Sequence, residues 1–197
     1  MHHYFLEYIE KKYNACKSID SGSLIQFSDL VEKTIQSKNK IFFCGNGGSL
    51  AIANHMLCDL YKQASTDSAI EPLVYSLSSN FELITAISND IDYSQIFSYQ
   101  LNRIGNKGDI LITISSSGDS QNIIEAINVA KKIGIVSVSL TGFNGGRSKE
   151  NSDLNIHVNE FNYGIIEDSH QTIIHAMTQF LRSKYLDKSL DKEKIKF

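Results

Sequence analysis

The chain has little proline, little cysteine and a small net charge, and it lacks long apolar runs. Of its 197 residues only one is proline and three are cysteines, and the formal net charge is -3. No apolar stretch is long enough to span a membrane, and the first residues do not resemble a signal peptide. We therefore expect a cytoplasmic protein that does not bind membranes. The charge disfavours direct binding of nucleic acids, which requires a basic face.

The cysteines exclude two further classes of protein. They lie at positions 16, 44 and 58, odd in number and widely spaced. Such cysteines form neither a disulfide framework nor a zinc knuckle. Cys44 and Cys58 stand in apolar surroundings, so we expect both to be buried thiols with no chemical role.

What the chain does contain is an alternation of apolar runs and amphipathic segments. The apolar runs predict strands at 40–44, 73–77, 109–115, 135–140 and 154–158. Helical spacing predicts helices at 4–19, 24–35, 49–63, 80–88, 94–104, 120–133 and 165–187. Strands separated by helices form a parallel sheet that helices cover on both faces. We therefore expect an α/β fold, a flavodoxin-like three-layer sandwich around a five-stranded parallel sheet, with additional N-terminal helices.

The rest of the chain gives no sign of a second domain. There is no linker-like stretch, and the single proline is Pro72, so we expect residues 1–197 to form one domain. Residues 188–197 are polar and charged, which predicts a frayed tail. The loop at 142–152, which contains Gly145 and Gly146, is expected to be mobile.

Two short segments share one design. Each follows a predicted strand, precedes a predicted helix and is rich in glycine and serine: Cys44-Gly45-Asn46-Gly47-Gly48-Ser49 and Ser115-Ser116-Ser117-Gly118-Asp119-Ser120. Such a turn directs backbone N–H groups and hydroxyls at one point, which suits a phosphate without any positive side chain. Parallel sheets bind ligands beyond the carboxyl ends of their strands. The pair therefore predicts a site for a small phosphorylated ligand.

Nucleotide-binding motifs do not fit these turns. No Gly-Lys-Ser/Thr follows the first turn, so it is not a Walker A loop. Gly45 and Gly47 match two glycines of the dinucleotide fingerprint, but Leu50 occupies the place of the third. The next predicted strand ends without the acidic residue that holds a ribose. The alternative without a ligand is that both turns are tight connections in which serine caps the helix.

The motifs resemble those of the sugar isomerase (SIS) domain family, and among its members most closely the phosphoheptose isomerases. The likeness runs from about Lys40 to Leu181. It rests on Gly45-Asn46-Gly47-Gly48-Ser49 with His55, Ser88-Asn89-Asp90, Ser115-x-Ser117-Gly118-x-Ser120, Leu140-Thr141-Gly142-x-x-Gly145-Gly146, and His170 with His175.

The resemblance implies a function and an assembly. It implies interconversion of sedoheptulose 7-phosphate and D-glycero-D-manno-heptose 7-phosphate, an early step toward the heptose of surface lipopolysaccharide or capsule. It implies a homotetramer with active sites between subunits, in which the N-terminal helices at 1–38 take part in packing. Many members also carry zinc, which predicts one zinc ion per subunit.

The resemblance also assigns roles to individual residues. Substrate binding falls on Gly47, Gly48, Ser49, Ser115, Ser117 and Ser120 for the phosphate, and on Asn46 and Asp90 for the sugar. The metal and catalytic cluster falls on His55, Asp59, Glu167 and His175.

The spacing of the cluster agrees with these roles. His55 and Asp59 are four residues apart on a predicted helix and share a face. Glu167 and His175, eight residues apart, fall within about 80° of each other on theirs. Two histidines and two carboxylates can complete a tetrahedral zinc site, although catalysis would then need a further or a dissociating ligand. His170 points away from His175, which favours a packing role.

Isomerisation through an enediol needs a base for a carbon-bound proton and an acid for the oxygens. We expect Asp59 to be the base and His175 the acid. The family usually has Glu at the position of Asp59 and Gln at that of Glu167, so Glu167 is an alternative base. Asp119 stands where Asn is common. These three differences point to a divergent subgroup, with a different sugar phosphate as an alternative substrate.

Two other functions occur within the same family. One is a non-catalytic tetrameric scaffold that binds the replication initiator protein, and such members tend to lose the residues that correspond to Asp59 and His175. Both are ionisable here, which favours an enzyme. The other is a sugar-phosphate sensor joined to a DNA-binding domain, and residues 1–38 show no basic helix-turn-helix pattern.

Overall fold

A computed structural model describes residues 1–187 of the chain. Its centre is a five-stranded parallel sheet with the strand order β2-β1-β3-β4-β5. The strands are β1 (Lys40–Gly45), β2 (Leu73–Ser76), β3 (Ile110–Ser115), β4 (Val136–Thr141) and β5 (Leu154–His157). Every residue of β3 is buried, because helices cover both faces of the sheet. The predicted α/β fold and its parallel sheet are confirmed.

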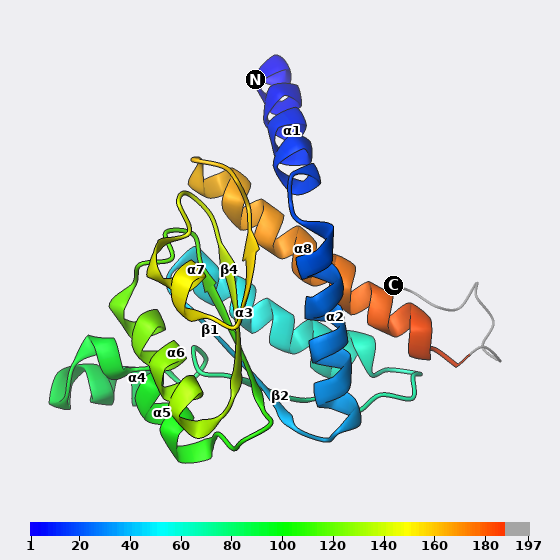
Figure 1. Ribbon diagram of the computed structural model, residues 1–197. Coiled ribbons are helices and arrows are strands. Elements are labelled where there is room, and N and C mark those ends of the chain that lie inside the picture. Colours follow the sequence, from blue (N-terminus) through cyan, green and yellow to red (C-terminus); the bar gives the residue numbers. More distant parts are fainter. Residues whose placement is uncertain (188–197) are drawn as a thin grey trace.

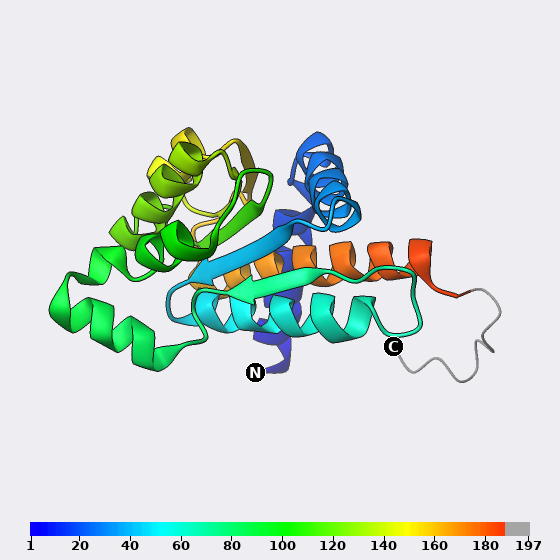
Figure 2. The same ribbon diagram turned by 90° about the horizontal axis from the view of Figure 1, so that it is seen from below.

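The helices form two outer layers around the sheet (Figure 1 and Figure 2). On one face α2 (Ser21–Gln36), α3 (Gly48–Cys58) and α8 (Tyr163–Tyr185) pack against apolar residues such as Phe43 and Ile112. On the other face α5 (Ser98–Ile104) and α6 (Gln121–Ile133) pack against Phe42 and Leu111. Neighbouring residues of one strand thus enter different cores, because side chains alternate across a sheet.

The remaining elements extend this sandwich. Helix α1 (His2–Lys17) extends away from the body of the molecule (Figure 1). The others are η1 (Asp59–Ala64), α4 (Phe81–Asp90), η2 (Tyr93–Gln95) and α7 (Gly146–Asn151). Within residues 1–187, no helix combines the length and the apolar character needed to cross a bilayer. The predicted tail at 188–197 lies outside the described residues.

Three predicted segments differ from the structure. The helix expected at 49–63 is α-helical only to Cys58 and continues as the π-helical turn η1. The helix expected at 94–104 is divided into η2 and α5. The loop expected to be mobile contains α7, which begins after Gly145 in a left-handed conformation with φ 87°. Glycine adopts this conformation without steric cost, so a helix can start directly after the turn.

The two cysteines predicted to be buried behave differently. Cys44 lies in the sheet and is buried, and burial raises the pKa of its thiol. Cys58 is exposed, so the prediction was wrong for this residue. The buried face of α3 is formed by Ser49, Ile52, Ala53 and Met56, and Cys58 follows Met56 by two residues, which places it on the opposite side of the helix.

The strand order determines where a ligand can bind. From β1 the chain passes to β2 on one side of it, and then crosses back to β3 on the other side. The segments that follow β1 and β3 therefore diverge, and they leave a crevice at the carboxyl ends of these strands. Gly45 pairs with Ile114, so both Gly/Ser turns begin at the same level of the sheet.

Candidate functional site

A pocket of about 170 Å³ lies at this crevice. It is lined by Asn46, Ser49, Ile114, Ser115, Ser116, Ser117, Ser120, Tyr163 and Glu167. The residues that line it include all four serines that the sequence assigns to a phosphate. No lysine or arginine is among them, so anion binding here depends on backbone N–H groups and hydroxyls.

The first Gly/Ser turn leads directly into α3. Gly47 precedes the helix with φ 54°, and Gly48 is the first residue of the helix. A Cβ atom on Gly45 would lie 2.5 Å from the carbonyl oxygen of Ser49, so only glycine allows the chain to turn this tightly. The first N–H groups of α3 have no partner within the helix and carry its positive dipole end, which favours an anion.

The second Gly/Ser turn is locked against the segment that follows β4. Gly118 has φ 68°, and a Cβ atom there would lie 1.9 Å from the carbonyl oxygen of Gly145. The Ser148 N–H donates to the carbonyl of Gly118, and the Gly142 N–H donates to the carbonyl of Ser116, each with a donor–acceptor distance of 2.9 Å. The turn that holds the serines is therefore fixed by backbone contacts rather than by a ligand.

The serine hydroxyls of this turn accept bonds from the backbone. Ser115 Oγ accepts from the N–H of Gly118 at 3.1 Å, and Ser117 Oγ accepts from the N–H of Asp119 at 3.3 Å. An accepting hydroxyl still has its own proton to donate. Both serines can therefore donate to a phosphate oxygen without losing the bonds that shape the turn.

Asp119, one of the three differences from the family pattern, is turned toward Arg147. Its Oδ1 accepts from Arg147 Nε at 2.9 Å and from the Arg147 backbone N–H at 3.2 Å. These hydrogen bonds lower the pKa of Asp119. The negative charge of Asp119 is paired with Arg147 and lies outside the set of residues that line the pocket, so it does not act directly against a phosphate there.

Asn46 is held by a pair of amide hydrogen bonds. Asn46 and Asn122 each donate Nδ2 to the Oδ1 of the other at 2.9 Å. The hydroxyl of Tyr93 also donates to Asn46 Oδ1, at 3.1 Å. Asn122, Tyr93 and Tyr163 were not predicted as site residues, because nothing in their local sequence shows that they reach the site.

A second cluster lies between α3 and α8. The Nε2 atoms of His55 and His175 are 2.9 Å apart, and each lies 3.4 Å from a carboxylate oxygen of Asp59. Ligand atoms of these three residues all lie within 4.8 Å of one another. Asp59 is 6 % exposed, whereas both histidine side chains are about half exposed. The amide nitrogen of Gln171, one turn before His175, lies 2.9 Å from its Nε2.

The spacing of this cluster fits zinc. Two ligands of a tetrahedral zinc ion are separated by roughly 3.3 Å when the bonds are about 2.0–2.1 Å long. Asp59 Oδ2 is buried and makes no hydrogen bond within residues 1–187, so it can accept a cation. Three protein ligands form one face of a tetrahedron and leave the fourth position for substrate, as in catalytic zinc sites.

Glu167 lies in the pocket rather than in this cluster. Its carboxylate oxygens come within 2.5–2.6 Å of the position that a Cβ on Gly48 would occupy, at the start of α3. It lines the pocket together with Tyr163. Asp90, at the exposed end of α4, accepts a bond from Asn89 and is not among the residues that line the pocket.

His170 has the packing position that its direction on the helix predicts. It is completely buried, and neither ring nitrogen makes a hydrogen bond of good geometry to the residues that the structure describes. Burial lowers the pKa of His170 to about 4, and the polar backbone of Thr141 opposes this shift. Two histidines of one helix, His170 and His175, therefore have opposite environments.

Several known proteins are similar to this chain in sequence or in structure. A probable phosphoheptose isomerase from Thermoplasma acidophilum is 34% identical over 91% of this chain and 98% of its own length. A phosphoheptose isomerase from Campylobacter concisus is 36% identical over 80% of this chain and 83% of its own. The solved phosphoheptose isomerase of Neisseria gonorrhoeae superposes with a TM-score of 0.84 at 31% identity, covering 92% of this chain and 96% of that one.

The family profile agrees with these relatives. The profile of the SIS domain matches residues 4–142, which include both Gly/Ser turns, His55 and Asp59. The match covers more than half of the chain, and the fold, the pocket and the relatives lead to the same assignment. The chain therefore belongs to the SIS domain family.

Proposed function

We propose that this protein is an aldose–ketose isomerase that interconverts sedoheptulose 7-phosphate and D-glycero-D-manno-heptose 7-phosphate. One observation carries the proposal: the pocket for an anion and the cluster of His55, Asp59 and His175 lie along the same two helices. The names of the relatives, phosphoheptose isomerases at 34–36% identity, support this substrate.

The distance between the two parts suits a long sugar. Helix α3 begins at the pocket with Gly48 and Ser49, and His55 follows Ser49 by six residues, or about 9 Å along the axis. Tyr163 and Glu167 line the same pocket at the start of α8, and His175 follows Glu167 by eight residues, about 12 Å further on. A phosphate in the pocket would thus place the other end of an extended seven-carbon sugar near Asp59.

The reaction moves one proton between neighbouring carbons. From the ketose, Asp59 takes a proton from C1 while the carbonyl oxygen on C2 gains one, which gives an enediol. The hydroxyl on C1 then gives up its proton and becomes the aldehyde, and Asp59 returns the carbon-bound proton to C2. His175, 3.4 Å from Asp59, moves the protons at the two oxygens. Serines and backbone N–H groups at the pocket hold the phosphate and fix the orientation of the sugar.

We also propose that the cluster holds one zinc ion per subunit, with His55, Asp59 and His175 as ligands. Bound there, zinc would occupy the His175 Nε2 that otherwise moves the protons, and it would polarise the oxygens of the sugar in place of that nitrogen. Glu167 as a fourth ligand remains a prediction, and its place beside Gly48 favours a role toward the substrate instead. The same position favours Asp59 over Glu167 as the base, since Glu167 lies at the phosphate end.

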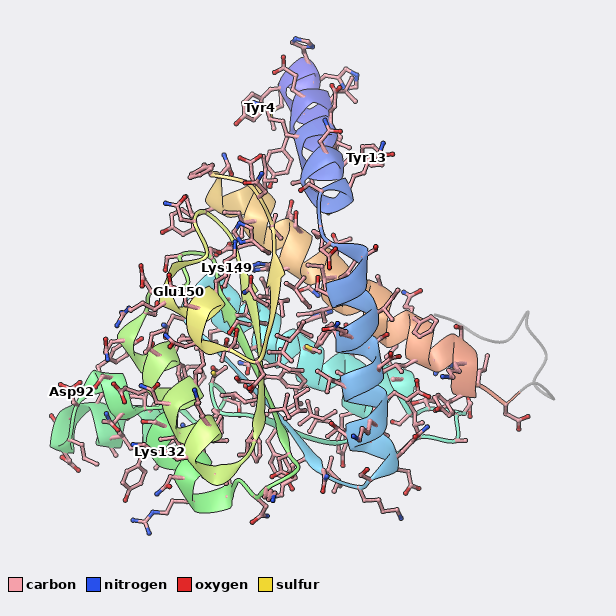
Figure 3. All side chains as sticks on the ribbon, in the orientation of Figure 1. Tyr4, Tyr13, Asp92, Lys132, Lys149 and Glu150 are labelled. Atoms are coloured by element: carbon pink, nitrogen blue, oxygen red, sulfur yellow. The ribbon has the colours of Figure 1, made fainter. Side chains whose placement is uncertain are left out.

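We further propose that the active molecule is a cytoplasmic homotetramer that serves lipopolysaccharide or capsule heptose synthesis. Helix α1 exposes five apolar or aromatic side chains, among them Tyr4 and Tyr13 at 63% exposure each. Figure 3 shows these two tyrosines extending to either side of the helix, away from the body. A second copy of the chain would cover this surface. Asp90 could then face the sugar of a neighbouring subunit, as a site between subunits requires.

A coupled assay tests the function. Purified protein supplied with zinc should convert sedoheptulose 7-phosphate, and Asp59→Asn, which keeps the shape of the side chain but not its basicity, should not. Absence of turnover in the zinc-loaded wild type would refute the proposed reaction. Capture of the replication initiator protein without any turnover would instead support the scaffold function.

A further inference from the structure

The helix that carries two of the three proposed metal ligands is irregular at the cluster of His55, Asp59 and His175, which we call the metal group because we propose that it binds zinc. Helix α3 ends at Cys58, and from Asp59 to Ala64 the chain forms the π-helical turn η1. π-helical turns are rare, and they occur mostly as single turns at functional sites. Asp59, the first residue of η1, is also the residue whose carboxylate lies between the two histidines. What stabilises this turn therefore bears on the position of the carboxylate.

Side chains supply hydrogen bonds to the carbonyls at the end of η1. The last carbonyls of a helix have no partner within it. Hydroxyls of the segment that follows bond to three of them: Ser65 to Tyr61, Thr66 to Lys62 and Ser68 to Ala64. The carbonyl of Gln63 is the exception, because its partner comes from a distant helix.

That partner is Arg182 on α8. Its NH1 donates to the carbonyl of Gln63 at 2.5 Å and to that of Thr66 at 2.6 Å. The residue is only 5% exposed, so the guanidinium is held in the interior between the two helices. Arg182 thus joins α8 both to Gln63 within η1 and to Thr66, which lies beyond the end of η1.

Arg182 and His175 share one face of α8. They are seven residues apart, close to two full turns, or about 10 Å along the axis. Apolar residues of α8, among them Ile173 and Ile174, pack in one core with Met56 and Leu60 of the α3–η1 helix. Beside this packing, α8 contacts that helix through His175 at the proposed metal group and through Arg182 beyond it. The contact of Arg182 does not depend on a bound metal.

We propose that Arg182 is a positioning residue for the metal group: by holding α8 against η1, it places His175 at ligand distance from Asp59 and His55. This inference rests on the proposed metal group. An aspartate has one methylene and little reach, so it cannot compensate for a shift between the helices. A misplacement of about 1 Å in such a site can cost about 100-fold in rate.

Zinc affinity in a set of variants tests the role of Arg182. We would measure competition for zinc with a chelator and record the visible absorption spectrum of the cobalt-substituted protein, in wild type, Arg182→Lys, Arg182→Met and Lys184→Met. Lys184 is the matched control, because it lies on the same turn of α8 but pairs with Glu32 of α2 at 2.7 Å. Circular dichroism establishes that each metal-free variant is folded.

Arg182→Met should lower zinc affinity about 10- to 100-fold, as the loss of outer partners does at other metal sites, and weaken the tetrahedral cobalt spectrum. Arg182→Lys should fall between Arg182→Met and wild type, and Lys184→Met should stay within about twofold of wild type. Should Arg182→Met fail to fold, the comparison of Arg182→Lys with Lys184→Met decides.

Two results would overturn the inference. If the folded Arg182 variants bind zinc as wild type does and lose only stability, Arg182 is a structural contact between helices. If the wild type itself binds no zinc, the metal group is wrong and the role of Arg182 falls with it. The wild-type measurement thus separates a failure of the proposed site from a failure of the positioning role.

Discussion

The pocket at the crevice and the metal group are built in different ways. Most of the pocket is formed by two short segments whose backbone conformation creates the site, with hydroxyls added by serines and with Tyr163 and Glu167 of α8 beside them. The metal group consists of three side chains, and its two histidines are 120 residues apart in the chain. The first kind of site depends on the absence of side chains at its glycines, whereas the second depends on how two helices pack.

The difference predicts that the two parts fail independently. Changes at the metal group should remove chemistry and leave anion binding intact. Changes at the glycines should disturb anion binding through the backbone. The following substitutions test this separation, in order of decreasing expected effect.

His175→Ala should have the largest effect. It removes the proposed acid and one of the three ligands, so kcat should fall by about 10²- to 10⁴-fold, the range for a lost acid–base group. Binding of inorganic phosphate, measured by calorimetry, should stay within about twofold of wild type. Turnover near the wild-type level would remove His175 from the mechanism, and a parallel loss of phosphate binding would show that the two parts are coupled.

Gly118→Ala should act on the pocket instead. Alanine at this position would have to adopt φ 68°, and its Cβ would lie 1.9 Å from the carbonyl oxygen of Gly145. We therefore expect a loss of about 2–4 kcal/mol in the free energy of unfolding. Weaker phosphate binding should accompany it. Gly47→Ala is the control, because it also has positive φ but meets no atom within 4 Å. If urea unfolding gave the two variants equal losses in the free energy of unfolding, the close contact between Gly118 and Gly145 would not contribute to stability.

Burial of His170 on α8 should make the stability of the folded protein depend on pH. The pKa of His170 is lowered to about 4 in the folded protein, so the unfolded state binds more protons between about pH 4 and pH 6.5. Stability should therefore fall as the pH drops through this window, by about 2–3 kcal/mol between pH 7 and pH 4.5.

The substitution His170→Leu should remove this part of the pH dependence in urea unfolding. His2→Asn, at an exposed residue of α1, should keep it. If the stability of His170→Leu fell between pH 7 and pH 4.5 by as much as that of the wild type, other groups would cause the pH dependence.

Glu167→Gln should have the smallest effect. It removes a negative charge from a pocket that no lysine or arginine lines. Because this charge would repel the phosphate, phosphate affinity should rise several-fold, which corresponds to about 1 kcal/mol for two partly exposed charges. Zinc content by elemental analysis should stay unchanged, because Glu167 lies beside Gly48 and not in the metal group. Loss of zinc with unchanged phosphate affinity would instead make Glu167 the fourth ligand.

Much of the pocket was visible in the sequence because its information is local. A buried strand, a turn of glycines and serines and a helix follow one another within about ten residues in each case. Strand bounds were predicted to within one residue for the same reason, since continuous apolar runs mark strands of a covered parallel sheet. The break at Asp59 and the short helix α7 were missed, because their hydrogen-bond partners lie far away in the chain: Arg182 donates to η1, and Gly118 accepts from the N–H of Ser148 in α7.

The sequence by itself determined the fold class, the two turns and the pairing of His55 with Asp59, because strand and helix periodicity and four-residue spacing are properties of a single segment. Only the tertiary structure decided which distant groups meet. It joined His175 to that pair, placed Glu167 in the pocket and turned the charge of Asp119 toward Arg147. The physical reason is that the packing of α8 on α3 and of one loop on another fixes distances between side chains, and no local pattern encodes that packing.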